Sequence, residues 1–392
     1  MGTAGAAAGV GTAPPAALVL QTALLVLAAL LAVMTFLPLS RSHAWWVRMF
    51  DFPRLQIATL AAVVWVALVA VALLGGGVGM WGWAIVVALG VSVAIQAVQM
   101  LPYSPLWTVQ TEPADPVLAD PDRRLRLVTS NVLMQNRDGE RWLSVIREAD
   151  PDVVVAVEAD AWWAETAGAL TDTHPHTVLV PQDDTYGMLV FSKLPLTQTE
   201  VRHLVEPEVP SLYLTAELRS GEPVSLVFLH PRPPRPDIAQ DSTLRDAELV
   251  LAGRDVAQID GPVVVAGDLN DVAWSHTTRL FQTLSGLLDP RVGRGAFSTF
   301  HAEHWWLRYP LDHVFHSGHF ALVELRRLGA VGSDHFPILI ELEMNPAIAP
   351  RQSGPDADTH DLGEGREMVA EAHEMKAEES EAEHRERVED DQ

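Results

Sequence analysis

Residues 262–271 read PVVVAGDLND, a run of apolar residues that leads directly into a Gly-Asp-Leu-Asn-Asp motif. A short apolar run that ends in turn-forming residues predicts a buried strand. Asp268 and Asn270 follow this strand and, by the alternation of an extended chain, lie on the same side of it. Asp268 is placed to orient or deprotonate a water molecule, and Asn270 to hydrogen-bond an oxyanion.

A second motif of this kind lies further along the chain, before another apolar run. Residues 332–335 (GSDH) stand directly before the apolar run 336–340 (FPILI). Asp334 and His335 can therefore serve a metal ion and a phosphoryl group from adjacent positions. Asp312 begins a further strand, and if it meets His335 in space it would hold that imidazole protonated, as a donor to transition-state charge. The two motifs together favour metal-assisted phosphoester chemistry.

Two earlier strands also end in polar residues. Asn131 lies at the end of the strand predicted at 125–129, where it offers a neutral ligand for a metal-bound water or a phosphate oxygen, although a lone Asn there is more often a turn former. Glu158 follows 153–157 (VVVAV), and a carboxylate at that position is costly to bury unless it is paired or bound to a cation. Mg²⁺ and Mn²⁺ require such hard oxygen ligands, while an exposed Glu is an equal alternative if the motif stands alone.

Two further motifs carry weaker signals. Tyr186 stands beside Gly187 and before another apolar strand, where structural packing is the more common role of a tyrosine. His230 ends a strand and is followed by a proline-rich loop that fixes the direction of its side chain. A His at that place is able to donate a proton to a phosphate oxygen, and a loop His without a role is the competing interpretation.

Charge weakens the interpretation as a general nuclease, and composition excludes cysteine chemistry. The formal net charge is −24, and residues 351–392 account for part of it with 15 acidic and 5 basic residues. Proteins that bind nucleic acid nonspecifically carry clustered basic residues, whereas Lys193 and Lys376 are the only lysines here. Cysteine is absent, which excludes disulfides, thiolate metal sites and cysteine nucleophiles.

The first hundred residues differ in composition from the rest of the chain, because they carry almost no charge. Three uncharged apolar stretches, at about 16–37, 56–74 and 81–101, each have roughly the 20 residues that a transmembrane helix needs. We therefore expect a membrane region over 1–101, a proline-rich and acidic linker over 102–123, a catalytic domain over 124–344 and an acidic disordered or transiently helical tail over 345–392. The protein is expected to be a multi-pass membrane protein.

The sequence leaves open on which side of the membrane the catalytic domain lies. Arg41, Arg48 and Arg54 lie between the first two apolar stretches, so the positive-inside rule places this loop, and with three spans the catalytic domain, in the cytoplasm.

The catalytic region is expected to be α+β. Many neighbouring strands with few helices favour packed sheets over a doubly wound parallel sheet. Strands are predicted at 125–129, 153–157, 188–191, 212–218, 224–229, 263–266, 313–316 and 338–342, and helices at 140–148, 161–170, 242–258 and 277–284.

In this order, the motifs Asn, Glu, Tyr-Gly, His-x-x-Pro, Gly-Asp-x-Asn, Asp-His and Ser-Asp-His resemble the endonuclease/exonuclease/phosphatase superfamily of Mg²⁺-dependent phosphodiesterases and phosphatases. The resemblance covers about residues 124–342 and implies a four-layer sandwich of two packed β-sheets flanked by helices. It also implies that Glu158 is the principal metal ligand, with Asn131 and Asp334 close to a Mg²⁺ ion, or Mn²⁺ as the alternative. Some members have an Asp where this chain has Leu133, which favours a single ion held with several waters.

The resemblance also implies the catalytic roles. Asp268 would activate the attacking water, Asn270 would hold the phosphoryl oxygen, and His230 would contact the scissile phosphate. His335, supported by Asp312, would stabilise the transition state. Tyr186, from the Tyr-Gly motif, is included among the catalytic residues.

Three functions remain in competition. The leading one is a membrane-anchored Mg²⁺-dependent phosphoesterase acting on a lipid-linked or membrane-proximal phosphate ester or pyrophosphate. The second is a metal-dependent DNA or RNA nuclease, and the third is a non-catalytic membrane scaffold. Among membrane-anchored bacterial members, the resemblance extends to actinobacterial proteins associated with glycopeptide resistance, which implies a domain outside the cell, in conflict with the arginine count.

Overall fold

The computed structural model describes residues 15–76, 78–233 and 241–390. It divides into a helical unit, Met1–Arg41 with Pro53–Met100, and a sandwich unit, Ser42–Phe52 with Leu101–Gln392. The first 14 residues of the expected membrane region and the last two of the expected tail lie outside the described residues. The segment Ser42–Phe52 was expected within the membrane region, yet it packs as part of the sandwich unit.

The helical unit contains the three apolar helices that the sequence predicts. Each is long and apolar enough to cross a membrane. Inside the unit, the Gln96 amide accepts a hydrogen bond from Arg54 and donates one to Thr35, so one buried polar group joins all three helices. The elements of this unit are α1 (Pro15–Phe36), η1 (Leu37–Ser40), α3 (Arg54–Val71), η2 (Ala72–Gly76) and α4 (Gly79–Met100).

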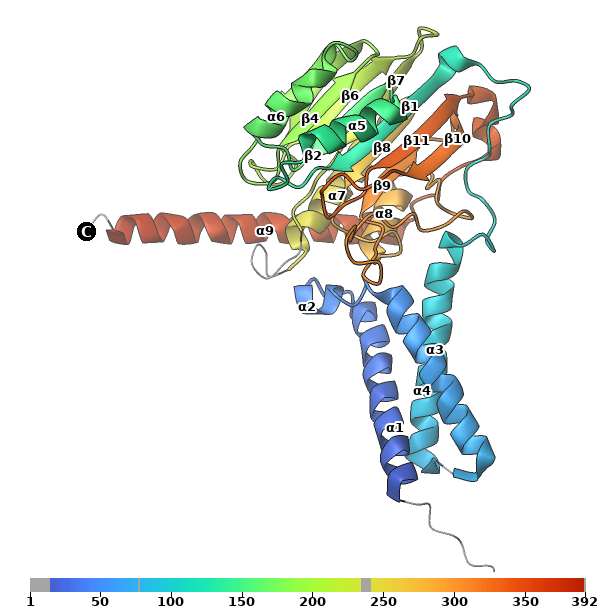
Figure 1. The fold of residues 1–392 in the computed structure, drawn as a ribbon. Coiled ribbons are helices and arrows are strands. Elements are labelled where there is room, and N and C mark those ends of the chain that lie inside the picture. The colour runs from blue at the N-terminus through green and yellow to red at the C-terminus, as the bar shows by residue number, and fades with distance from the viewer. Residues whose placement is uncertain (1–14, 77, 234–240, 391–392) are drawn as a thin grey trace, which may run out of the picture. The chain divides into compact units, whose positions relative to one another are not determined.

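The sandwich unit is built on two mixed sheets (Figure 1). The first has the order β10-β11-β1-β2-β4-β3 and the second the order β5-β6-β7-β8-β9. The pairs β1–β2 and β7–β8 are parallel, and the other pairs are antiparallel. The strands are β1 (Arg124–Asn131), β2 (Val153–Val157), β3 (His176–Val180), β4 (Met188–Ser192), β5 (Leu196–Arg202), β6 (Ser211–Glu217), β7 (Pro223–Phe228), β8 (Val263–Asp268), β9 (Asp312–His316), β10 (Phe320–Arg327) and β11 (Ile338–Met344).

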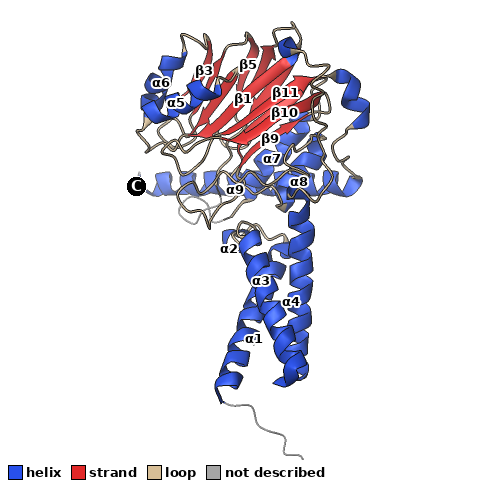
Figure 2. Ribbon diagram, turned by 45° about the vertical axis from the view of Figure 1, so that its right-hand side comes forward, coloured by secondary structure: helices blue, strands red, loops and turns tan. Residues whose placement is uncertain are grey.

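Four layers form because both faces of the central strands are covered. Side chains of β1 and β2 meet those of β6, β7 and β8 in the core between the sheets, among them Leu127, Val155 and Phe228. The outer face of the first sheet packs on helices α5 (Gly139–Ala149) and α6 (Ala161–Ala167). The outer face of the second sheet packs on α7 (Thr243–Val256) and α8 (His276–Ser285), as Figure 2 shows. The expected α+β four-layer sandwich is confirmed.

Full coverage explains the sequence of the central strands. All five residues of β2 are buried, so the strand reads as a continuous apolar run instead of an alternating one. On the outer face of the first sheet, the rings of Trp142 on α5 and Trp163 on α6 pack edge-to-face, with centroids 5.8 Å apart.

The segments expected as linker and tail both make ordered contacts. Thr111, in the expected linker, is buried and hydrogen-bonds His316 at 2.8 Å, and Ala114 N donates to Leu322 O. The tail, expected to be disordered or transiently helical, contains a long helix, α9 (Thr359–Asp390). Met368 and Ala372, one helical turn apart, are buried against α7 and α8, so a narrow apolar stripe orders the first part of a largely acidic segment.

Glu248 on α7 is a buried carboxyl group whose titration should be visible in stability. Burial and the nearby Glu206 raise its pKa to about 8, against opposing effects of the Ser211 hydroxyl and Arg232. Because the folded protein binds this proton more tightly than the unfolded chain, the contribution of Glu248 to stability falls as pH rises from about 4.5 to 8.

We therefore expect Glu248→Gln to become increasingly more stable than the wild type as pH rises through this window. Thermal unfolding of both proteins at several pH values between 5 and 8.5 measures the difference. Glu217→Gln, at an exposed position on β6, is the control and should follow the wild type at every pH. A constant difference across the pH range would contradict a raised pKa for Glu248.

Candidate active site

The strand ends of both sheets meet at one edge of the sandwich. Parallel β1 and β2 end together, with Asn131 opposite Val157, so Glu158 follows beside Asn131. In the other sheet, Asp268 at the end of β8 is paired with Asp312 at the start of antiparallel β9. β11 runs antiparallel to β1, which brings the preceding Ser-Asp-His motif to the same edge. The topology thus explains why polar residues that are far apart in sequence converge.

A pocket of about 280 Å³ opens at this edge. Of the residues singled out from the sequence, five line it: Glu158, His230, Asn270, Asp334 and His335. The remaining lining residues include Phe52, Leu133, Gln135, Thr185, Pro233, Phe300 and Leu311.

Asn131 connects the two sheets through its amide group. Its Nδ2 donates to Glu158 Oε1 at 2.7 Å and to Asp268 Oδ2 at 3.0 Å, while its Oδ1 accepts from Leu133 N at 2.9 Å. In this arrangement Asn131 Nδ2 holds two carboxylates, and its Oδ1 keeps a second lone pair beside the one that accepts from Leu133 N.

His335 lies between two carboxylates. Its Nδ1 is 2.8 Å from Asp312 Oδ2, and its Nε2 is 3.6 Å from Asp268 Oδ2. Burial alone would lower the pKa of His335, but Asp312 and Asp268 together raise it to about 10, so the imidazole is a cation and a donor at neutral pH. The structure thus brings Asp312 to His335, the condition on which the sequence argument depended.

Asp268 is buried and held on both oxygens. Oδ1 accepts from Asn270 N at 2.9 Å, and Oδ2 accepts from Asn131. Burial and the Asp312 carboxylate raise the pKa of Asp268 above its ordinary value, against the opposing charge of His335. A raised pKa makes a carboxylate a better proton acceptor.

The glycine before Asp268 is required by a close backbone approach. Gly267 has φ of 146°, and a Cβ at this position would lie 1.9 Å from Leu229 O. The contact joins the end of β8 to the residue before His230. Accordingly, His230 Nδ1 lies 3.2 Å from Asp268 O, which keeps the histidine beside the catalytic motif.

Tyr186 is not among the described residues that line the pocket. It is buried, and its ring lies 6.1 Å from the ring of His230. Burial raises the pKa of Tyr186 to about 12, so its hydroxyl stays protonated. The structure places Tyr186 beside His230.

The donor set fits a hard divalent cation. The pocket holds the carboxylates of Glu158 and Asp334, and the carboxylates of Asp268 and Asp312 lie behind it. Asp312 Oδ1 is buried and has no hydrogen-bond partner among the described residues. Glu158 and Asn270 have positive φ angles of 59° and 50°, backbone strain of the kind that clusters at functional sites. Leu133 lines the pocket without adding a carboxylate.

Sequence reasoning missed several residues at this edge. Arg245 on α7 donates to Asn270 O at 2.9 Å, and Phe300 lies on His335 with ring centroids 5.0 Å apart. A loop group of His301, Glu303 and His304 also brings possible ligand atoms within 4.8 Å of one another. Its His-x-Glu-His spacing was a usable signal for the last group, whereas an arginine within a helix and a loop phenylalanine carry none.

Comparison with known proteins gives one family. The model of the Endonuclease/Exonuclease/phosphatase family matches residues 128–335, which is more than half of the chain and contains every site residue named above except Phe52. No curated protein matches the chain.

Several solved structures are similar in fold. An endonuclease/exonuclease/phosphatase from Beutenbergia cavernae is 23% identical, with a TM-score of 0.46, 57% of this chain covered and 72% of the other. TDP2 from D. rerio, complexed with a single-strand DNA product, is 16% identical, with a TM-score of 0.48 and coverages of 56% and 99%. Beta toxin from Staphylococcus aureus is 16% identical, with a TM-score of 0.41 and coverages of 55% and 99%.

Proposed function

Because the chain belongs to the endonuclease/exonuclease/phosphatase family, whose members are metal-dependent hydrolases of phosphoester bonds, we propose that it hydrolyses a lipid-linked or membrane-proximal phosphate ester or pyrophosphate. The observation that carries the proposal is the presence, in one chain, of this pocket and of three helices apolar enough to cross a membrane. A membrane anchor raises the local concentration of substrates that are themselves held in the bilayer.

Glu158 and Asp334 would hold the metal ion, which we propose to be Mg²⁺, with Mn²⁺ as the alternative. When bound, the ion supplies positive charge that stabilises the oxygens of the phosphoryl group in the transition state. Asn131 would keep the carboxylates of Glu158 and Asp268 in place through the two hydrogen bonds of its amide nitrogen.

The remaining side chains would handle the proton and the developing charge. Asp268, with its raised pKa, would accept a proton from the attacking water. Asn270 uses Nδ2 to donate to Pro231 O at 2.9 Å, and the second N–H of that group would bind a phosphoryl oxygen. His335 would donate to the phosphoryl oxygens, and His230 would contact the same group. Tyr186 would support the orientation of His230.

Surface chemistry favours a substrate at a lipid surface over nucleic acid. The net charge of −24 opposes the nonspecific binding of DNA, which depends on clustered basic residues that release counterions. Trp305 and Trp306 are 78% and 56% exposed, in the loop that follows the pocket residue Phe300. Exposed tryptophans are typical of protein surfaces that meet the membrane interface.

The test compares substrate classes on the purified full-length protein in detergent with Mg²⁺. We expect phosphate release from a polyprenyl pyrophosphate or hydrolysis of a phospholipid in mixed micelles, and no cleavage of plasmid DNA. DNA cleavage that falls steeply with salt would instead identify a nuclease. If all substrates were untouched and Asp268→Asn behaved like the wild type, a non-catalytic scaffold would replace the enzyme.

A further inference from the structure

The segment Ser42–Phe52 stands in the sequence between two apolar helices but packs within the sandwich unit. Its backbone is tied to the start of α7, because Ala44 forms an antiparallel bridge with Asp241 and Ser242 N donates to His43 O at 2.9 Å. At its other end, Trp274 Nε1 donates to Asp51 O at 2.7 Å. Phe52 lies edge-to-face on Tyr309, 5.9 Å between ring centroids, and lines the pocket.

Arg48 connects this segment to α7 and α8 through its guanidinium group. It is 3% exposed, and its Nη2 lies 2.9 Å from Asp246 Oδ2. The same nitrogen donates to Thr277 Oγ1 on α8. An arginine of this burial is kept by its partners, because an unpaired guanidinium would be costly inside the protein.

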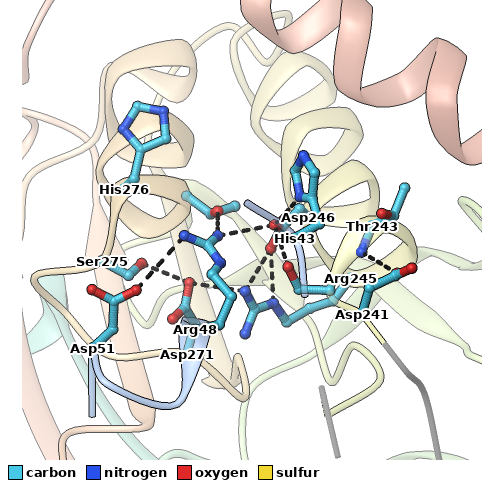
Figure 3. A network of polar contacts seen from close by, with 12 residues as sticks. His43, Arg48, Asp51, Asp241, Thr243, Arg245, Asp246, Asp271, Ser275 and His276 are labelled. Atoms are coloured by element: carbon cyan, nitrogen blue, oxygen red, sulfur yellow. Dashed lines mark hydrogen bonds and ion pairs between the residues drawn. The ribbon is translucent and has the colours of Figure 1, made fainter. Parts of the chain in front are cut away.

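Asp246 is the centre of the network drawn in Figure 3. Its Oδ2 also accepts from Ser242 Oγ at 2.8 Å and lies 3.1 Å from His43 Nδ1, and its Oδ1 accepts from Arg245 Nε and Nη2 at 2.9 and 2.6 Å. Burial alone would raise the pKa of Asp246, but Arg245 and Arg48 hold it well below its usual range. The carboxylate is therefore ionised and shared between two arginines.

From Asp246 the network reaches the catalytic motif in one step. Arg245 Nη1 donates to Asn270 O at 2.9 Å, and its Nη2 lies 3.5 Å from Asp271 Oδ2. The Asp271 carboxylate in turn accepts from Ser275 Oγ at 2.6 Å and from Val272 N at 2.9 Å. The chain of contacts from Arg48 to the left-handed residue Asn270 thus passes through buried charged groups alone.

We propose that Ser42–Phe52 is part of the active site and that Arg48 is a positioning residue, which fixes the Asn270–Asp271 turn through Asp246 and Arg245. Phe52 from the same segment forms part of the pocket wall. The segment between the first two apolar helices thereby sets the geometry of a catalytic motif that lies more than 200 residues later. The kinetic part of this inference rests on the role proposed above for Asn270.

The experiment compares Arg48→Met, Arg48→Lys and Asn270→Ala in the full-length protein in detergent with Mg²⁺. Arg48→Met keeps an unbranched apolar chain in place of the aliphatic part of arginine and removes the charge and the donors. We expect kcat to fall on the order of 100-fold, the effect of a displaced catalytic group, with KM changed much less. Arg48→Lys should recover part of kcat, because an ammonium restores the charge beside Asp246.

A second readout does not depend on activity. Hydrogen–deuterium exchange should become faster at the amides of Asn270 and Val272 in Arg48→Met, since both are held by carboxylates of this turn. The matched control is Arg219→Met. It removes the arginine partner of another buried carboxylate, that of Asp152, which directly precedes β2. It should lower the melting temperature and leave kcat and exchange at the turn unchanged.

The outcomes separate this inference from the proposed function. Unchanged exchange at the turn in Arg48→Met, with kcat within twofold of the wild type while Asn270→Ala is inactive, would overturn the positioning role. If Asn270→Ala were fully active, the role proposed for Asn270 would fail, and faster exchange in Arg48→Met would still support the coupling of the segment to the turn.

Discussion

Asp268→Asn is expected to lower kcat by about 10³-fold, within the range for loss of a positioned general base. An amide has nearly the shape of the carboxylate but cannot accept a proton from water. Asp268 is buried and bonded on both oxygens, so no other carboxylate can take its place without a movement of Asn131 or Asn270. The melting temperature should fall modestly, because the amide NH2 cannot accept one of the two hydrogen bonds that the carboxylate of Asp268 accepts.

Steady-state kinetics on the best substrate and thermal unfolding measure these effects together. Asp260→Asn makes the same chemical change at an exposed position before the start of β8 and should leave kcat unchanged. A kcat within tenfold of the wild type for Asp268→Asn would remove Asp268 from the role of base.

Glu158→Gln is expected to raise the Mg²⁺ concentration for half-maximal activity on the order of 100-fold. The substitution removes one negative charge from the donor set but keeps an oxygen and the length of the side chain. Glu158 lines the pocket, and Asn131 Nδ2 holds its Oε1 at 2.7 Å.

Activity measured over a series of Mg²⁺ concentrations, and Mn²⁺ binding followed by its paramagnetic resonance signal, report on this site. Glu165→Gln, exposed on the nearby helix α6, is the control and should have the metal requirement of the wild type. An unchanged requirement in Glu158→Gln would show that the ion is held by other groups.

Local motifs made the strand ends of the site predictable. Asp268, Glu158 and His335 each follow or precede an apolar run, and the sequence therefore shows both the strand and the polar residue at its end. Three strands were not predicted, namely β3, β5 and β10. All three lie at sheet edges, where one side is open and a strand needs no continuous apolar run.

Contacts between distant parts of the chain could not be predicted from the sequence. Arg48 was interpreted only as a charge that orients the membrane helices, and its partner Asp246 has no signal of its own within α7. The helical stripe of Met368 and Ala372 is similarly hidden in an acidic segment. A buried ion pair or a narrow helical contact is defined by its partner, and one sequence does not show which residues are partners.

The pairing of Arg48 with Asp246 across 198 residues also has a consequence for the order of folding. During synthesis the segment Ser42–Phe52 emerges first and must wait until α7 has been made before its arginine is neutralised. Contacts of such long sequence separation form late, after local helices and hairpins. The sandwich unit therefore completes its folding only after Ser42–Phe52 and α7 have both been synthesised and have come together.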